Sequence, residues 1–252
     1  MIEFENVRKT YADGTVAIED LTLSIETGEF MVLVGPSGCG KTTMLRLINR
    51  MEETTEGQVR VEGKDVMSLD PIALRRSIGY VIQGGGLLPH RTVVDNIATT
   101  PLLNGMPRRQ ARARALGLMP IVGLDQSLAG RYPSQLSGGQ AQRVGVARAL
   151  AAGAHTLLMD EPFSAIDPVV RRDLQREIKR IQRDTGATVV FVTHDINEAL
   201  LLADRLAVIG PHGRIEQLDT PDRTLSAPAN AWVRDFIEAG RPQIHTGTET
   251  GE

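Results

Sequence analysis

The stretch FMVLVGPSGCGKTTMLRLINRM, residues 30–51, decides the fold of this chain. Its apolar start, FMVLV, lacks the alternation of a half-exposed strand and is typical of a strand buried on both faces of a sheet. The segment GPSGCGKTT at 35–43 matches Gly-x4-Gly-Lys-[Ser/Thr], the pattern of a phosphate-binding loop between a strand and a helix. The amphipathic segment MLRLINRM supplies that helix. The sequence therefore predicts a P-loop fold with a site for nucleotide phosphates.

Each residue type in this loop has a physical role in holding phosphate. Glycines let the backbone wrap closely, so that N–H groups and the positive end of the following helix point at the anion. Lys41 is expected to reach the β- and γ-phosphates, and the Thr42 hydroxyl to reach Mg²⁺. The sequence leaves open whether the Cys39 thiol is a reactive thiolate or an inert, buried group. The residues that we assign to nucleotide binding are Gly35, Pro36, Ser37, Gly38, Cys39, Gly40, Lys41, Thr42 and Thr43.

A second buried strand, TLLMDE at 156–161, ends in two carboxylates. Neighbouring residues of a strand point in different directions, so Asp160 and Glu161 can serve different purposes. Asp160 suits the Mg²⁺ shell, and Glu161 suits the general base that takes a proton from water. An acidic pair at a strand end can also be a helix cap or a surface pair. The phosphate loop in the same chain favours the catalytic interpretation.

The remaining patterns indicate an α/β fold with two kinds of sheet. Unbroken apolar runs favour a mostly parallel core sheet covered by helices, whereas alternating runs near the N-terminus favour an antiparallel subdomain beside it. The further unbroken runs are 188–194 and 206–210, and the alternating runs are 2–7, 15–29 and 58–63. Residues from about 85 to 150 lack strand runs, and we interpret them as an inserted helical subdomain. We expect one nucleotide-binding domain over 1–240 and a disordered tail over 241–252.

The composition argues against several classes of protein. A formal net charge of -3 and a pI near 6.0 argue against a nucleic-acid partner. The one cysteine permits neither an intrachain disulfide nor a cysteine-rich metal site. No apolar run approaches the ~18 residues of a membrane span, and the start MIEFENVRKT lacks the features of a signal peptide. We therefore expect a cytoplasmic protein without a membrane span.

The segment LSGGQ at 136–140 settles the class of the protein. Its hydroxyl, unobstructed backbone N–H groups and amide stand at a helix start, which forms an anion site with nothing opposite it. The chain resembles an ATP-binding cassette ATPase, because it also contains, in the family's order, the phosphate loop, Gln83, DEP at 160–162, AID at 165–167 and His194. The resemblance covers residues 1 to about 238 and implies the ABC type of P-loop fold.

The resemblance implies a role for each matched residue. ATP and Mg²⁺ would be sandwiched between two copies, so that the phosphate loop of one copy faces Ser137, Gly138, Gly139 and Gln140 of the other. Tyr11 would stack on adenine, and Asp167 would cross the interface between the copies. Gln83 would bind the metal and link the site to a membrane partner, and His194 would contact the γ-phosphate within its own subunit. The implied catalytic residues are Glu161, His194 and Gln83, and the implied metal ligands are Thr42, Gln83 and Asp160.

Two helix starts can be located from their capping residues. Asp167 is followed by proline and then by apolar residues at helical spacing, namely Val170, Leu174, Ile178 and Ile181. Asp195, with Glu198 three residues later, has the spacing of a capping box. We therefore expect the first role of Asp195 and Glu198 to be starting a helix.

Within the family, longer segments resemble the ATPase of bacterial osmoprotectant importers for glycine betaine, choline or proline betaine. These segments are IGYVIQ (78–83), LLPHRTVVDNIA (87–98), LMDEPFSAIDP (158–168), FVTHDINEALLLADRLAVI (191–209) and LDTPDRTLSAPANAWVRDFI (218–237). The resemblance implies a peripheral, ATP-hydrolysing subunit on the cytoplasmic face of the cell membrane, docked on integral permease subunits and served indirectly by a solute-binding protein. The ATPases of importers for other small polar solutes, such as amino acids, share much of the sequence of these segments and remain an alternative.

Two other classes and three departures from the pattern bear on this interpretation. A cassette acting on nucleic acid or ribosomes usually fuses two cassettes or inserts long coiled coils, and a non-hydrolysing module would be expected to lack the base, Glu161. GGG at 84–86 replaces bulkier residues, so we expect a more flexible segment there. Ile166 replaces the usual leucine, which conserves volume. With the chain ending at Glu252, we expect the C-terminal cystathionine-β-synthase-type (CBS) modules of many osmoprotectant ATPases to be absent.

Overall fold

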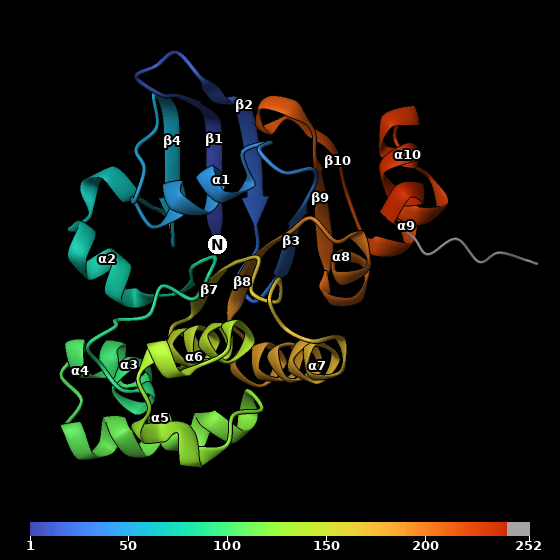
Figure 1. Cartoon of the computed structure of the whole chain (residues 1–252). Coiled ribbons are helices and arrows are strands. Elements are labelled where there is room, and N and C mark those ends of the chain that lie inside the picture. Colours follow the sequence, from blue (N-terminus) through green and yellow to red (C-terminus); the bar gives the residue numbers. More distant parts are fainter. Residues whose placement is uncertain (241–252) are drawn as a thin grey trace, which may run out of the picture.

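The computed structural model describes residues 1–240 and contains two sheets (Figure 1). The larger sheet has the strand order β10-β9-β3-β8-β7-β6, and its edge strand β10 runs antiparallel to β9 while the other neighbours are parallel. Its strands are β3 (Phe30–Val34), β6 (Ile78–Val81), β7 (Thr156–Asp160), β8 (Thr188–Thr193), β9 (Arg205–Ile209) and β10 (Ile215–Asp219). Every residue of β3, β7 and β8 is buried, and the prediction of a mostly parallel core sheet is confirmed. The predicted tail, 241–252, lies outside the described residues.

The smaller sheet is antiparallel, with the strand order β2-β1-β4-β5. Its strands are β1 (Ile2–Thr10), β2 (Val16–Ile25), β4 (Glu56–Val61) and β5 (Lys64–Asp65). Leu21, Leu23 and Ile25 of β2 are buried while the residues between them are exposed, because one face of the sheet packs on the protein and the other meets water. The predicted antiparallel N-terminal subdomain is confirmed.

Between β6 and β7 the chain forms a group of helices, drawn below the sheets in Figure 1. The group contains α3 (Val93–Ile97), α4 (Thr99–Leu103), α5 (Arg108–Ile121) and α6 (Gly138–Ala151), with 3-10 turns at Gln126–Gly130 and Pro133–Gln135. The fold therefore includes the inserted helical subdomain that the sequence predicts. Helix α6 joins this group to the larger sheet, because it packs on β6.

Two hydrophobic cores lie on opposite faces of the larger sheet, and β3 contributes to both. Phe30, Val32 and Val34 belong to the core shared with the helical subdomain. Met31 and Leu33 belong to the core shared with α1 (Lys41–Ile48) and the smaller sheet. Successive residues of a strand face opposite sides, so one short strand anchors both layers. The loop that follows β3 is thus attached to a fully buried strand that packs on both layers.

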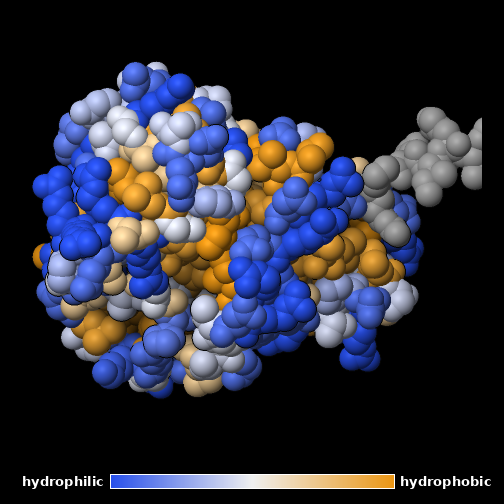
Figure 2. Space-filling model, turned by 90° about the horizontal axis from the view of Figure 1, so that it is seen from below, coloured by the Kyte–Doolittle hydropathy of each residue, from blue (hydrophilic) through white to orange (hydrophobic). Residues whose placement is uncertain are grey.

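The remaining helices surround the sheets. They are α2 (Pro71–Ser77), α7 (Pro168–Thr185), α8 (Ile196–Leu202), α9 (Pro221–Ser226) and α10 (Ala231–Gly240), with 3-10 turns at Val66–Ser68 and Pro211–Gly213. As predicted, α7 begins after Asp167 and buries Leu174 and Ile178. Its charged outer face forms a continuous hydrophilic band in Figure 2. No helix within residues 1–240 has the length and apolarity of a membrane span.

Candidate functional site

Residues 35–40 connect the end of β3 to the start of α1 in very little space. Gly40 has a φ of +105°, in the left-handed region, and a Cβ there would lie 2.5 Å from the carbonyl oxygen of Ala17. A Cβ on Gly35 would collide with the carbonyl oxygen of Ile209. Glycine is therefore required at both positions for the loop to pack between β2 and β9. The structure has the strand, tight turn and helix that a phosphate-binding loop needs.

Lys41, the first residue of α1, folds its side chain back into the loop. Its Nζ donates hydrogen bonds to the carbonyl oxygens of Gly35 and Pro36, both at 2.7 Å, and Lys41 is only 5% exposed. In the described part of the chain these carbonyls and the Cys39 sulfur, at 3.6 Å, are its hydrogen-bond partners, and all are neutral. A buried cation with neutral partners favours the arrival of an anion.

Thr42 and Asp160 bring two oxygen atoms together beside this loop. The Thr42 hydroxyl donates to Oδ1 of Asp160 at 3.0 Å, and Asp160 is 1% exposed. Burial raises the pKa of the Asp160 carboxyl, although the Thr42 hydrogen bond acts in the opposite direction. A hydroxyl and a carboxylate are ligands that Mg²⁺ accepts, usually with phosphate oxygens and water completing its shell. Residues 1–240 contain no group of three or more His, Cys, Asp or Glu side chains able to hold a metal.

The three predicted catalytic residues meet at Glu161. Its Oε1 lies 3.2 Å from Nδ1 of His194, and its Oε2 accepts a hydrogen bond from Nε2 of Gln83 at 3.3 Å. Its backbone has a φ of +45°, a strained value for a residue with a side chain. The Glu161 N–H donates to Val192 and its carbonyl accepts from Gln142 at 2.7 Å, which holds the strained peptide in place. Gln83, also predicted as a metal ligand, directs its nitrogen to Glu161, so its carbonyl oxygen is the atom left to face a cation.

The phosphate loop and Glu161 open onto one cavity of about 310 Å³, a size that suits a small molecule. Tyr11 also lines it, and its hydroxyl lies 3.2 Å from the Thr43 hydroxyl. The lining residues are Tyr11, Thr15, Val16, Ala17, Ser37, Gly38, Gly40, Lys41, Thr42, Thr43, Gln83 and Glu161. Thr15, Val16 and Ala17 were not predicted from the sequence, because they belong to an alternating strand pattern that carries no chemical signature.

Cys39 takes part in the loop through its backbone. Its side chain is 5% exposed and belongs to the core between α1 and the smaller sheet. Its carbonyl oxygen accepts a hydrogen bond from the N–H of Gly213 at 2.8 Å. Of the two alternatives that the sequence left open, the structure favours the buried thiol.

The segment LSGGQ begins α6 and does not reach this cavity. Ser137 caps the helix: its hydroxyl oxygen accepts from the N–H of Gln140 at 3.2 Å, while its own N–H donates to Oε1 of Gln140 at 2.9 Å. Ser137 and Gly138 are exposed, and Gly139 packs against the carbonyl of Ala165. Asp167 is also exposed and caps α7. Within residues 1–240, none of these side chains lines the cavity of its own phosphate loop.

The glycine segment 84–86 contacts helix α6 through a side chain that the sequence did not indicate. All three glycines have a positive φ, which explains their identity. The Arg148 guanidinium, on α6, donates to the carbonyl oxygens of Gly85 and Gly86 at 2.9 and 2.8 Å. This contact ties the residues after Gln83 to the helix that begins with LSGGQ, and the expected flexibility of the segment stays a prediction.

Asp195 and Glu198 do not form the capping box that their spacing suggests. Asp195 caps α8 by accepting from the N–H of Asn197 at 2.8 Å, as expected. The N–H of Asp195, however, donates to the Thr193 hydroxyl at 3.0 Å rather than to Glu198. Glu198 is buried, and its carboxylate accepts from that hydroxyl at 2.7 Å. Because Glu198 is buried against α7, its carboxylate contacts the Thr193 side chain instead of the backbone N–H of Asp195.

Comparison with known proteins agrees with this geometry. The profile described as ABC transporter matches residues 18–164, more than half of the chain. The carnitine transport ATP-binding protein OpuCA of Listeria monocytogenes serotype 1/2a is 52% identical over 96% of this chain and 60% of its own length. The glycine betaine uptake system ATP-binding protein YehX of Escherichia coli K12 is 50% identical over 97% of this chain and 78% of its own length.

A solved structure extends the comparison to three dimensions. The dimeric post-hydrolysis state of the ATP-binding cassette MJ0796, bound to ADP and Pi, superposes with a TM-score of 0.83 at 35% identity, covering 88% of this chain and 99% of that one. The choline transport ATP-binding protein OpuBA of Bacillus subtilis is 48% identical over 94% of this chain, which spans 62% of its length. The chain thus spans less than two thirds of the length of two of these three curated relatives. From its motifs, its fold and these matches, the chain belongs to the ABC transporter family.

Proposed function

We propose that this chain binds and hydrolyses ATP to power a membrane importer, and that the importer carries a quaternary ammonium osmoprotectant such as glycine betaine or choline. The observation that carries the hydrolytic part is the placement of Glu161 between Gln83 and His194, on the cavity that also contains Lys41. The names of the relatives, which concern carnitine, choline and glycine betaine transport, support the importer and its solute.

Binding of ATP would use charges that the fold already holds in place. The Lys41 ammonium would exchange its two carbonyl partners for phosphate oxygens, with the N-terminus of α1 behind it. Thr42 and Asp160 would hold Mg²⁺, which would neutralise charge on the phosphates when bound. Tyr11 would stack on the adenine at the mouth of the same cavity.

Hydrolysis would depend on the position of one carboxylate. Glu161 would accept a proton from the attacking water, with Gln83 fixing one of its oxygens and His194 the other. His194 uses Nδ1 for this contact, so its Nε2 remains for the γ-phosphate. The strained backbone of Glu161 would keep the carboxylate aimed at the cavity.

The site would be completed by a second copy of the chain. The LSGGQ residues Ser137, Gly138, Gly139 and Gln140 would offer an anion site that does not face their own phosphate loop. Asp167, the cap of α7, also lies outside the cavity of that loop. Two copies related by a two-fold axis would place each LSGGQ segment over the ATP of the other. The dimeric form of the related cassette supports this arrangement. The dimer would sit peripherally on the cytoplasmic face of the membrane, bound to permease subunits and receiving solute indirectly from a solute-binding protein.

Two experiments test the proposal at its two levels. The purified chain should release phosphate from Mg·ATP, and the absence of hydrolysis, with or without its permease, would refute the enzymatic part. Proteoliposomes that contain the chain with its permease and solute-binding protein should accumulate labelled glycine betaine or choline on addition of ATP. Uptake of amino acids but not of quaternary ammonium solutes would refute the proposed solute and favour the alternative importer.

A further inference from the structure

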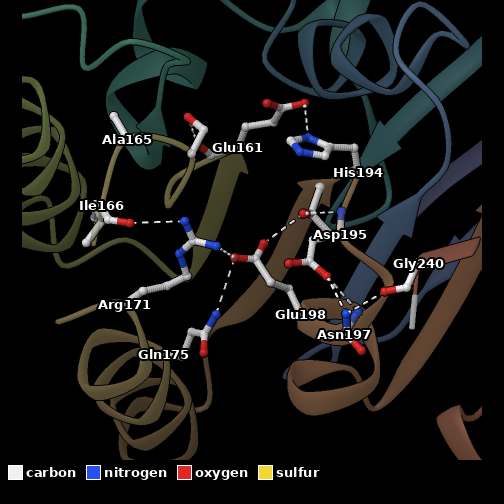
Figure 3. A network of polar contacts seen from close by, with 12 residues as sticks. Glu161, Ala165, Ile166, Arg171, Gln175, His194, Asp195, Asn197, Glu198 and Gly240 are labelled. Carbon is white, nitrogen blue, oxygen red and sulfur yellow. Dashed lines mark hydrogen bonds and ion pairs between the residues drawn. The ribbon is translucent and has the colours of Figure 1, made fainter. Parts of the chain in front are cut away.

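A buried carboxylate lies between two loops of the proposed site and belongs to neither. Glu198 projects from α8 and is 7% exposed. Figure 3 shows it between Arg171 of α7 and the residues around His194. Its Oε1 accepts from Nε2 of Gln175 at 3.3 Å, and its Oε2 accepts from the Thr193 hydroxyl at 2.7 Å. Burial raises the pKa of the Glu198 carboxyl, so its environment resists the charge unless a cation stays nearby.

The contact with Thr193 controls the residues on both sides of His194. The Thr193 hydroxyl has one hydrogen, and it donates this hydrogen to Glu198 in a hydrogen bond. Its oxygen then accepts the N–H of Asp195 at 3.0 Å. The side chain of Thr193, before His194, thus binds the backbone N–H of Asp195, after it. Glu198 orients the hydroxyl that makes this contact.

The nearby cation, Arg171, holds the other loop. One terminal nitrogen of its guanidinium donates to the carbonyl oxygen of Ile166 at 3.0 Å, and the other lies 3.9 Å from Oε1 of Glu198. Ile166 directly precedes Asp167. The Arg171 Nε is buried without a hydrogen-bond partner in the described residues. The two terminal nitrogens of the guanidinium thus have partners, while its third donor, Nε, has none. A buried donor without a partner is unusual for a side chain that only fills space.

We propose that Arg171 and Glu198 are positioning residues that join the loop ending at Asp167 to the loop carrying His194. The link runs from the Ile166 carbonyl through the guanidinium and the carboxylate to the Thr193 hydroxyl. Under the proposed function, on which this inference rests, a second copy touches the Asp167 loop while His194 faces the γ-phosphate. The link makes the position of His194 depend on the contact between the two copies.

Two variants break the link at different points, and a third serves as control. Glu198→Gln keeps the shape and an acceptor oxygen for Thr193 but removes the charge facing Arg171. Arg171→Met keeps a long side chain but removes the donor to Ile166, and it touches neither His194 nor its neighbours. Glu177→Gln makes the same carboxylate-to-amide change on α7, at an ion pair with Arg180 on the surface.

The first readout requires no hydrolysis. The ring ¹⁵N signals of His194, assigned through their loss in His194→Gln, are recorded without nucleotide. We expect them to shift in both Glu198→Gln and Arg171→Met and to stay unchanged in Glu177→Gln. Unchanged His194 signals in folded Arg171→Met would overturn the proposal. Should Glu198→Gln fail to fold, Arg171→Met still carries this test, because its side chain is 29% exposed.

The second readout separates positioning from stability. Misplacing a catalytic group by about 1 Å can lower kcat by up to roughly 100-fold. We expect a kcat loss within that range in both variants, with an unchanged KM for ATP, and no larger loss in the double variant than in the worse single one. Additive losses, or a kcat equal to that of Glu177→Gln, would overturn the proposal. A wild-type chain that hydrolyses no ATP would instead refute the proposed function, while the His194 signals would still decide whether the link exists.

Discussion

The phosphate loop and the LSGGQ segment are two helix starts with opposite surroundings. Before α1, the chain encloses the N-terminal end with its own residues: Lys41 is buried and Tyr11 closes the same cavity. Before α6, Ser137 is exposed and its cap is closed by Gln140 of the same turn. Both helix N-termini offer N–H groups to an anion, but only the first opens onto a cavity lined by residues of the same chain. Under the proposed function, one chain would carry a pocket, at the phosphate loop, and a lid, the LSGGQ segment, that would cover the pocket of a second copy.

The capping box does not disable the lid. It uses the Ser137 hydroxyl as an acceptor and Oε1 of Gln140 as an acceptor. The donors on the same side chains, the Ser137 O–H and the Gln140 amide, have no partner in the described residues and can reach a phosphate. One pair of residues can thus start a helix and recognise an anion at the same time.

The largest effect is expected from Glu161→Gln, which leaves both helix starts intact and removes only the carboxylate proposed as the base. General-base catalysis contributes about 10²- to 10⁴-fold, so kcat should fall by that order while ATP remains bound. Phosphate release measures the loss, and size-exclusion chromatography with Mg·ATP should reveal an accumulated dimer. Hydrolysis at the wild-type rate would show that another group is the base.

Lys41→Ala should damage the pocket and spare the lid. A hydrogen bond to a charged group is worth about 1.5–3 kcal/mol, which corresponds to an affinity loss of about 10- to 100-fold for ATP. Calorimetric titration of the monomer measures it, with Ser137→Ala as the matched variant on the other helix start. Equal affinities in the two variants would remove the distinction between pocket and lid.

Ser137→Ala should damage the lid and leave monomer affinity for ATP unchanged. Thr220→Ala is its control, because Thr220 caps α9 through the same type of contact, far along the chain from LSGGQ. Each variant loses about 0.5–2 kcal/mol of stability. Only Ser137→Ala should also lower kcat, by roughly tenfold, the equivalent of one charge-assisted hydrogen bond. A matching fall in kcat for Thr220→Ala would reduce Ser137 to a capping role.

The smallest effect is expected from Cys39→Ala inside the pocket's own loop. Because the thiol is buried in the core and its contact with the Lys41 ammonium is long, at 3.6 Å, ATP affinity should change little, and stability should fall by about 1 kcal/mol. N-ethylmaleimide should react slowly with the native chain, at the same rate with and without Mg·ATP. Fast alkylation that ATP blocks would place the thiol on the phosphate side of the loop.

The contrast also explains how much could be predicted from sequence. The loop before α1 and the two carboxylates at the end of β7 follow from short motifs, because spacing along the chain fixes their local geometry. Spacing also suggested a capping box for Asp195 and Glu198, which was wrong for Glu198, since burial against Arg171 and Gln175 outweighed the local cap. The hold of Arg148 on the glycine segment joins positions about sixty residues apart, and no local pattern encodes it.

The buried ammonium of Lys41 has a consequence for the stability of the whole protein. Its removal from water, with neutral partners alone, is a free-energy penalty that the chain incurs on folding, before any ligand arrives. Nucleotide therefore acts as a missing part of the fold, and its binding should raise the melting temperature as its concentration exceeds Kd. The variant Lys41→Met, with an apolar side chain of similar length, should melt at a higher temperature than the empty wild type and should gain less from the same concentration of ATP. The nucleotide-free protein is in this sense less stable than a variant without the buried ammonium would be. The ammonium, however, has already lost its water when the phosphates enter.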